Sequence, residues 1–372
     1  MKSDNPFLIS GYLNPSYFCD RETETDRIIS ALQNRRNMTL ISIRRLGKTG
    51  LIKNVFYHLQ NSKERLLYVD IFATSSLQDL VKALSSAIIL DEKKHSTDYL
   101  KKITRLVSGI KARLVFDNVT GNPAIELGYS NPQEMEMGIE QIFTYLASQK
   151  TKYIIAIDEF QQITYYPEKN VEAILRSHIQ SLTNCSFVFS GSNKHLLTSM
   201  FSDYGRPFYQ SSDFLFLNRI PRDEYVTFIY RKFSENKRNI QRADIETIVD
   251  FYDTYTFYVQ SFFNRLYATG EKNITIELIE ETKNLILEER EYVFQNYKNL
   301  LTENQFEVLK AIAKEKSIDK PNSKAFMKKY GFVQASSLNK TLNALLSKEM
   351  VYREDNNYKV YDVFFAKWLA KI

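Results

Sequence analysis

The sequence has few of the residues that build disulfide scaffolds or zinc sites. Its 372 residues include only two cysteines, Cys19 and Cys185, and their spacing matches no zinc or redox motif. The four histidines are scattered along the chain: His58, His95, His178 and His195. We therefore expect a metal-poor protein of a reduced compartment.

The sequence also has no long apolar run. Its longest apolar runs are the length of a β-strand, and the opening residues Met1-Lys2-Ser3-Asp4-Asn5-Pro6 do not resemble a signal peptide. We therefore expect a cytoplasmic protein without membrane contact. Hydrophobic residues make up 44% and charged residues 25% of the chain, as in ordinary globular proteins, and the length suffices for two or three domains.

The positive charge is unevenly distributed. The net charge is +6, but residues 301–372 contain 13 Lys and Arg against 8 Asp and Glu, so +5 lies in the last fifth of the chain. This asymmetry points to an anionic partner for the C-terminal segment, although a solvated lysine-rich face gives the same count.

One segment has the pattern of a phosphate-binding loop. The apolar run 38–41 predicts a buried strand, and the apolar positions of residues 51–59 recur at helical spacing. Between them lies Ser42-Ile43-Arg44-Arg45-Leu46-Gly47-Lys48-Thr49, which follows G-x-x-x-x-G-K-[ST] except that Ser42 replaces the first glycine. In such a loop the lysine contacts the β- and γ-phosphates and the threonine hydroxyl binds Mg²⁺. The alternative is a plain strand–helix turn.

A second segment favours the phosphate-binding interpretation. The apolar strand expected at 153–157 ends in Asp158-Glu159, about 110 residues after the loop. The carboxyl end of such a strand lies beside the loop in a parallel sheet. Asp158 is then placed to hold Mg²⁺ through water, and Glu159 to orient or deprotonate the attacking water. Acids at a strand end also serve as caps, so it is the two motifs together that predict a P-loop NTPase.

The surrounding pattern predicts an α/β fold with a parallel sheet. Further strands are expected at 66–70, 186–190 and 214–217. Helices are expected near 24–36, 77–90, 134–149 and 170–182. Residues 91–133 read as an irregular insertion because Gly and Pro interrupt them. Strands that alternate with helices favour layers of helices on a parallel sheet.

The remainder of the chain predicts helices and a winged helix-turn-helix. Helices are expected near 222–235, 243–252, 256–269 and 275–295. Thr302 is expected to cap a helix over 305–312, which precedes helices near 323–330 and 335–349 and a β-hairpin over 350–361. We therefore expect three domains: a P-loop α/β domain (1–220), a small helical lid domain (221–297) and a winged helix domain (298–372).

Several motifs together resemble those of the archaeal-type ATPase family, a P-loop group related to the AAA+ and STAND ATPases. Phe18-Cys19-Asp20-Arg21-Glu22-Thr23-Glu24 is similar to the family's F-x-G-R-E-x-E box, with Asp20 in place of glycine. Arg44-Arg45-x-Gly-Lys-Thr is similar to its P-R-R-x-G-K-T, and Phe189-Ser190-Gly191-Ser192 to the S-G-S after its fourth strand. The resemblance covers almost the whole chain and implies ATP and Mg²⁺ as ligands.

Candidate site residues follow from the motifs and the resemblance. The nucleotide-binding candidates are Arg21, Arg44, Arg45, Leu46, Gly47, Lys48, Thr49 and Gly50; the box that contains Arg21 lies near the adenine in relatives. The metal ligands are Thr49 and Asp158. The catalytic candidates are Glu159, Ser192 as a γ-phosphate sensor, and Arg206 as an arginine finger in cis or trans. Several of these candidates have an alternative. Arg44 and Arg45 could contact a neighbouring subunit or belong to a solvated basic loop, and Ser192 could cap the end of its strand. Arg206 stands in Gly-Arg-Pro, which is also an ordinary loop sequence.

The winged helix has two interpretations. Residues on or near its recognition helix and wing suit base edges and phosphates: Gln334, Ser336, Ser337, Asn339, Lys340, Arg353 and Lys359, with Lys328 and Lys329 nearby. Glu354-Asp355 at the wing tip would repel a duplex. In the alternative, the winged helix contacts protein, and Phe364-Phe365 and Trp368 pack against the ATPase core.

These features predict an ATP-binding, Mg²⁺-dependent ATPase that acts as a slow nucleotide-controlled switch, coupled through its winged helix to DNA, to a protein partner or to a second copy of the chain. The alternative is a nucleic-acid-binding or scaffold protein with a vestigial nucleotide site. Two differences from the family's motifs favour this alternative. Ser42 replaces the first glycine of the phosphate-binding loop, and Thr256-Phe257 replaces the His-Pro of the family's G-H-P-x-Y-x-Q motif.

Overall fold

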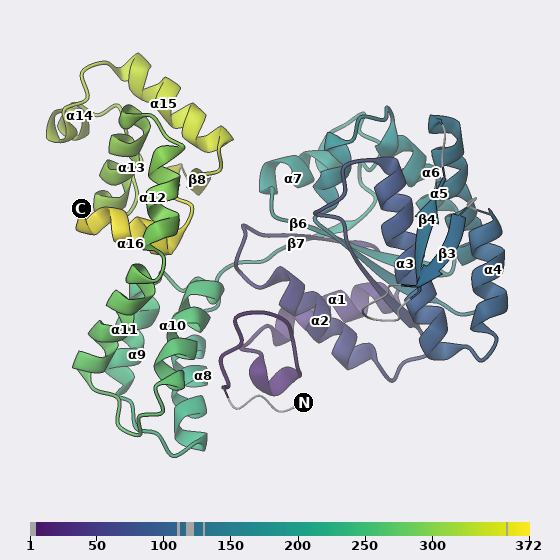
Figure 1. The fold of residues 1–372 in the computed structure, drawn as a ribbon, viewed down its shortest axis with the longest axis horizontal. Coiled ribbons are helices and arrows are strands. Elements are labelled where there is room, and N and C mark those ends of the chain that lie inside the picture. Colours follow the sequence, from purple (N-terminus) through teal and green to yellow (C-terminus); the bar gives the residue numbers. More distant parts are fainter. Residues whose placement is uncertain (1–4, 110–111, 117–122, 129–130, 355) are drawn as a thin grey trace. The chain divides into compact units, whose positions relative to one another are not determined.

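A computed structural model describes residues 5–109, 112–116, 123–128, 131–354 and 356–372 (Figure 1). The described chain divides into two compact units. The first contains Ser10–Ile220, and the second contains residues 5–9 together with Pro221–Ile372. Each unit has its own core and is described by itself. The three-domain division at 220 and 297 remains a prediction.

The first unit is built on a five-stranded sheet. Its strands are β1 (Met38–Ile41), β2 (Arg65–Asp70), β5 (Tyr153–Asp158), β6 (Cys185–Gly191) and β7 (Asp213–Phe216), in the spatial order β2-β5-β6-β1-β7. Every neighbouring pair is parallel. All residues of β1 and β5 are buried, as expected for central strands covered on both faces. The predicted parallel α/β fold is confirmed.

Helices cover both faces of this sheet and form two separate cores (Figure 1). Ile155 and Ile157 of β5 face one core, whereas Ile154 and Ala156 face the other, because successive side chains of a strand alternate. The second core contains α1 (Glu22–Gln33) and α2 (Lys48–Leu59). The first contains α3 (Leu77–His95), α4 (Tyr99–Gly109), α5 (Pro132–Ala147), α6 (Val171–Ser181) and α7 (Lys194–Ser202).

The segment expected to be an irregular insertion is more regular than its sequence indicates. Helix α3 continues to His95, α4 follows, and β3 (Ala112–Phe116) pairs with β4 (Pro123–Leu127) in an antiparallel hairpin. Glu92 in the last turns of α3 is buried, because Lys102 and Arg65 hold its carboxylate at 3.0 and 3.1 Å. These ion pairs join residues of separate elements, so no local sequence pattern predicts them.

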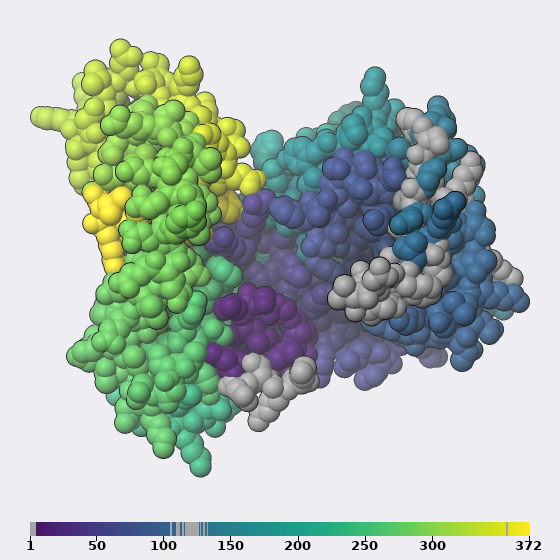
Figure 2. All heavy atoms as spheres, viewed as in Figure 1, coloured from purple at the N-terminus to yellow at the C-terminus, as the bar shows by residue number. Residues whose placement is uncertain are grey.

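The second unit is helical except for one hairpin. Its elements are α8 (Arg222–Glu235), α9 (Arg242–Phe251), α10 (Thr256–Ala268), α11 (Ile276–Glu288), α12 (Glu291–Asn299), α13 (Glu303–Glu315), α14 (Lys324–Tyr330), α15 (Ala335–Ser347), β8 (Val351–Glu354), β9 (Asn357–Val360) and α16 (Val363–Lys371). Thr302 caps α13 through a reciprocal capping box with Gln305, as the sequence predicts. The helix expected over 275–295 is two helices, and α16 was not expected. Figure 2 shows the surface of these segments in green to yellow.

The first described residues belong to the core of the second unit. Phe7 is fully buried among aromatic rings of α8 and α10: Phe228, Phe233, Phe263 and Tyr267. Asn5 donates to the carbonyl of Asn264 at 2.8 Å, and the amide of Asn264 donates to the carbonyl of Phe7 at 2.7 Å. A segment at the start of the chain thus completes a helical core built more than 200 residues later.

Across the described residues, no helix combines the length and the apolar character needed to span a bilayer.

Candidate active site

The loop between β1 and α2 places a glycine at the N-terminus of α2. Gly47 precedes Lys48, the first residue of α2, and has φ of 93°. Arg45 also has a positive φ, 71°, but Ser42 does not. The N–H of Ser42 instead continues the sheet by donating to the carbonyl of Gly191 at 3.4 Å. A serine in the left-handed region would be strained, but Ser42 is not in that region, so the replacement of the first motif glycine costs no backbone energy there.

The structure brings Lys48 to both acids at the end of β5. Its ammonium lies 3.0 Å from Glu159 Oε1 and 3.9 Å from Asp158 Oδ1. The side chain of Lys48 is 8% exposed, so this is a largely buried cluster of one cation and two carboxylates. A phosphate group that reaches Lys48 has to compete with Glu159 for the ammonium.

Asp158 is held by three hydroxyl groups as well as by Lys48. Its Oδ2 accepts hydrogen bonds from Thr49 at 2.7 Å and Tyr68 at 2.8 Å, and its Oδ1 accepts one from Ser190. Burial alone would raise the pKa of Asp158, but the charge of Lys48 and these hydroxyl groups outweigh it and leave the pKa below its ordinary value. Asp158 is therefore an ionised carboxylate.

Glu159 is restrained at its backbone and at one carboxylate oxygen. The residue has φ of 57° and ψ of 43°, an unfavourable conformation for a non-glycine residue. Its Oε2 accepts hydrogen bonds from Gln161 Nε2 at 2.6 Å and from Ser192 Oγ at 2.7 Å. Burial favours a raised pKa of Glu159, but Lys48, Gln161 and Ser192 outweigh it and lower the pKa.

The remaining loop residues differ in burial and in contacts. Arg44 Nε donates to Ser192 Oγ at 3.4 Å, which connects Arg44 to Glu159 through one hydroxyl group. Leu46 is buried, whereas Arg45 and Thr49 are exposed. A Cβ atom at Gly50 would lie 3.1 Å from the ring of Phe18, so Gly50 lets this ring approach the first turn of α2.

Two predicted site residues are engaged elsewhere. The guanidinium of Arg21 is held by Glu24 at 2.7 Å and by the carbonyl of Asn218. The guanidinium of Arg206 pairs with Glu172 of α6 at 2.7 Å. The structure therefore does not join either arginine to the Lys48 cluster, and their predicted roles remain predictions.

Sequence reasoning missed Tyr68 and Gln161. Tyr68 lies on β2, which pairs directly with β5, and its hydroxyl reaches Asp158 from the neighbouring strand. Gln161 follows Glu159 by two residues in the short helix Phe160–Tyr165. The position of Gln161 two residues after the acidic pair could have identified it from the sequence. The contact of Tyr68 with Asp158 could not be predicted in this way, because it depends on the order of the strands.

The donors present suit Mg²⁺ bound together with phosphate. The Thr49 hydroxyl and an ionised Asp158 carboxylate are oxygen donors, and Mg²⁺ typically takes one or two protein oxygens and completes its shell with phosphate and water. Among the described residues, no group of three or more His, Cys, Asp or Glu is arranged to hold a metal ion. The site thus fits a metal that arrives with a nucleotide.

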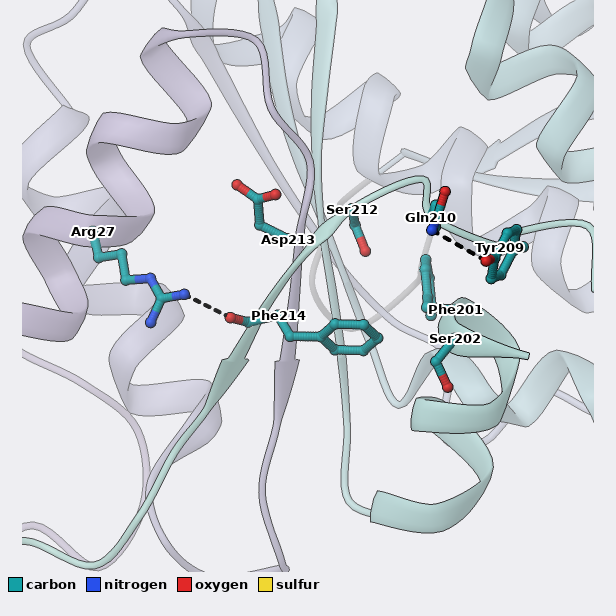
Figure 3. Close-up of a pocket in the computed structure, with 8 residues that line it drawn as sticks. All are labelled: Arg27, Phe201, Ser202, Tyr209, Gln210, Ser212, Asp213 and Phe214. Carbon is teal, nitrogen blue, oxygen red and sulfur yellow. Dashed lines mark hydrogen bonds between the residues drawn. The ribbon is translucent and has the colours of Figure 1, made fainter. Parts of the chain in front are cut away.

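A separate concavity lies along the edge strand β7 (Figure 3). Its volume is about 560 Å³, and its lining residues are Arg27, Phe201, Ser202, Tyr209, Gln210, Ser212, Asp213 and Phe214. Arg27 donates to the carbonyl of Phe214 at 2.9 Å. None of the candidate site residues lines this concavity.

Two protein-family models match parts of this chain. Residues 18–262 match the family model described as an ATPase domain predominantly from Archaea. Residues 292–371 match a probable winged helix domain. No curated protein sequence matches the chain.

Solved structures with the same fold span the whole chain. A Walker-type ATPase of Pyrococcus abyssi superposes with a TM-score of 0.66 at 20% identity, covering 99% of this chain and 100% of that one. The ORC2 protein of Aeropyrum pernix, described in ADPNP–ADP complexes, gives 0.60 at 14% identity, covering 100% and 97%. The ORC1 protein of Aeropyrum pernix in complex with DNA gives 0.56 at 12% identity, covering 99% and 97%.

Proposed function

Because this chain belongs to the ATPase family found predominantly in Archaea, we propose that it binds ATP with Mg²⁺, hydrolyses it slowly and acts as a nucleotide-controlled switch. The observation that carries the proposal is the buried cluster of Lys48 with Asp158 and Glu159. A P-loop lysine beside two ionised acids is the minimum that phosphate binding and water activation require.

The binding step uses the loop and the start of α2. Backbone N–H groups at the N-terminus of α2 attract the phosphates, and Lys48 moves its ammonium from Glu159 to the β- and γ-phosphates. Thr49 and Asp158 would hold the metal, which would neutralise phosphate charge. The ORC2 protein of Aeropyrum pernix, described in complexes with ADPNP and ADP, supports a nucleotide as the ligand.

In the hydrolysis step, Glu159 accepts a proton from the attacking water. The water oxygen forms a bond to the γ-phosphorus, the bond from that phosphorus to the β–γ bridging oxygen breaks, and its electron pair leaves with ADP. A glutamate carboxylate, whose ordinary pKa is about 4.3, is a weak base at neutral pH, since efficient general bases have a pKa near the working pH. This weakness is the physical reason to expect slow turnover.

The winged helix is the part of the chain that would respond to the nucleotide. It packs against the helices that precede it in the sequence. Lys359 of β9 lies 3.6 Å from Asp253, and the hydroxyl groups of Tyr255 and Tyr352 share a hydrogen bond. Phe364 of α16 packs on Tyr258 with a ring distance of 4.8 Å. Any rearrangement of α9 and α10 therefore carries the winged helix with it.

The aromatic face of α16 is buried inside the second unit. Phe365 and Trp368 pack against Phe294 of α12 with ring distances of 5.4 and 5.7 Å. The alternative interpretation from the sequence, in which this face packs against the ATPase core, is wrong, because the face is buried within its own unit. The start of α15, in contrast, is exposed.

Nucleotide-dependent thermal stabilisation tests the proposed function. A ligand at 100 times its dissociation constant adds about 2.7 kcal/mol to the free energy of unfolding. We expect ATP and ADP to raise the melting temperature of the wild type but not of Lys48→Ala. A wild-type protein that is indifferent to ATP, ADP and GTP would favour the vestigial-site alternative.

DNA binding by the winged helix is a second candidate function. Its support is the exposed start of α15, with five exposed side chains that suit bases or phosphates: Gln334, Ser336, Ser337, Asn339 and Lys340. The ORC1 protein of Aeropyrum pernix, described in complex with DNA, has the same fold. In contrast, Lys329 pairs with Glu315 at 2.5 Å and Lys359 with Glu354 at 2.9 Å, which reduces the cations that remain for phosphate.

Salt dependence of binding to random duplex DNA tests this candidate. With Lys328, Lys340 and Arg353 on phosphates, the slope of log K against log salt is expected near −2.7, and Lys340→Ala is expected to make it shallower by about one unit. Lys348→Ala is the matched control, because this ammonium donates to the carbonyl of Leu300 at 3.0 Å. Absence of a gel shift at about 10⁻⁴ M protein and low salt would eliminate the candidate.

A further inference from the structure

We propose that Gln161 is a positioning residue that fixes the Glu159 carboxylate for water activation, and that residue 191 is glycine to leave space for Gln161. The inference rests on the proposed ATPase function and deepens it. It assigns a mechanistic role to an amide outside the P-loop and the acidic pair.

The first observation is the contact itself. Gln161 Nε2 donates to Glu159 Oε2 at 2.6 Å, and the Gln161 side chain is buried, with 6% of the residue exposed. Glu159 turns the chain from β5 into the helix Phe160–Tyr165 through its positive φ. The turn brings the amide back onto the carboxylate two residues earlier.

The second observation is that the two carboxylate oxygens of Glu159 have different partners. Gln161 and Ser192 both donate to Oε2, whereas Lys48 contacts Oε1. When Lys48 turns to phosphate, Oε2 keeps the Gln161 amide and the hydroxyl and backbone N–H of Ser192 as donors, and Oε1 becomes available to a water molecule. The amide thereby holds the carboxylate in place while its other oxygen accepts the proton.

The third observation is steric. A Cβ atom built on Gly191 would lie 2.0 Å from Gln161 Oε1 and 3.1 Å from Leu197 Cδ2. Gly191 does not have a positive φ, so its backbone does not require glycine. We therefore attribute the glycine at position 191 to the space that the Gln161 amide needs.

The fourth observation separates positioning from packing. Gln161 Oε1 is buried and has no hydrogen-bond partner among the described residues. An unpaired buried acceptor costs stability, so an apolar side chain of similar size would pack at least as well. The amide is therefore explained by its donor, which serves Glu159.

The test compares Gln161→Met with Gln162→Met. Methionine keeps the volume of the side chain and removes the donor, so we expect Gln161→Met to lower kcat by about 10- to 100-fold. KM for ATP should be unchanged, and the melting temperature should be unchanged or higher. Gln162 donates to the carbonyl of Thr74 at 3.0 Å and not to Glu159, so Gln162→Met serves as the control with unchanged kcat. A wild-type kcat in Gln161→Met would overturn the positioning role.

A double-mutant cycle tests the role of Gly191. We expect Gly191→Ala to lower kcat in the wild-type background and to have no further effect in a Gln161→Ala background, where the new methyl group has room. Equal losses in both backgrounds would show that Gly191 acts independently of Gln161 and would overturn the steric part of the inference.

The split between kcat and KM is the readout that packing alone does not move. If the amide only held the carboxylate in place for water activation, ATP affinity should be unchanged in Gln161→Met while kcat falls. A rise in KM for ATP as large as the loss in kcat would show a disturbed nucleotide site and would contradict positioning. Failure of the wild type to bind or hydrolyse ATP would instead contradict the proposed function.

Discussion

The Lys48 ammonium lies 3.0 Å from Oε1 of Glu159, and both side chains are largely buried. The residue expected to hold the γ-phosphate and the residue expected to activate water are therefore each other's partner. Under the proposed function, phosphate binding and release of Glu159 Oε1 are one event, because a single ammonium serves both anions. This relationship is the physical basis of the proposed switch.

Replacing Glu159 by glutamine should separate binding from turnover. Glutamine keeps the size of the side chain but accepts no proton, so we expect Glu159→Gln to bind ATP normally and to hydrolyse it about 10²- to 10⁴-fold more slowly. Single-turnover hydrolysis, together with a binding titration, measures both quantities. Normal hydrolysis by this variant would remove Glu159 from the mechanism.

The acidic cluster should make stability depend on pH below about pH 4.5. The folded pKa values of Asp158 and Glu159 lie below their unfolded values of about 3.9 and 4.3. Their contribution to the free energy of unfolding is therefore fully present above those values and is lost as the pH falls through the folded pKa values.

Urea unfolding at several pH values between about 3 and 7 checks this dependence. The midpoint of the wild type should fall more steeply below about pH 4.5 than that of Glu159→Gln. Asp26→Asn is the control, because Asp26 is exposed on α1. Equal pH dependence in wild type and Glu159→Gln would contradict the ion-pair account.

The strand and loop that build the site were predictable because their signals are local. Central strands such as β1 and β5 are continuous apolar runs, since both of their faces are buried. Gly47-Lys48-Thr49 and Asp158-Glu159 each stand at the end of such a run. Parallel strands bring both ends to the same edge of the sheet, and the strand order leaves only β6 between them.

The parts that escaped prediction depend on partners distant in sequence. The buried Glu92 pairs with Arg65 and Lys102 in the segment where Gly and Pro had predicted an irregular insertion, and where the structure has the end of α3 and α4. Arg206 pairs with Glu172 in this structure, a contact that its Gly-Arg-Pro context does not reveal. The contact of Gln161 with Gly191 is likewise a product of the folded chain.

Removal of the Phe7 ring should destabilise the helical unit. The ring is fully buried among four aromatic rings, and truncation of a buried Phe to Ala costs about 3–5 kcal/mol. Tyr204→Ala is the control, because Tyr204 is 92% exposed. Thermal unfolding of both variants measures the difference, and equal melting temperatures would contradict the placement of residues 5–9 in that core.

The most direct test of the central claim is a titration with fluorescent ATP, with and without Mg²⁺, on wild type, Lys48→Ala and Thr49→Ala. The account predicts saturable binding by the wild type that Mg²⁺ strengthens, loss of binding in Lys48→Ala, and loss of the Mg²⁺ effect in Thr49→Ala. Lys53→Ala, one and a half turns further along α2 with its ammonium on the ring of Tyr68, should retain both properties. No binding by the wild type at about millimolar nucleotide, or unchanged binding in Lys48→Ala, would contradict the claim.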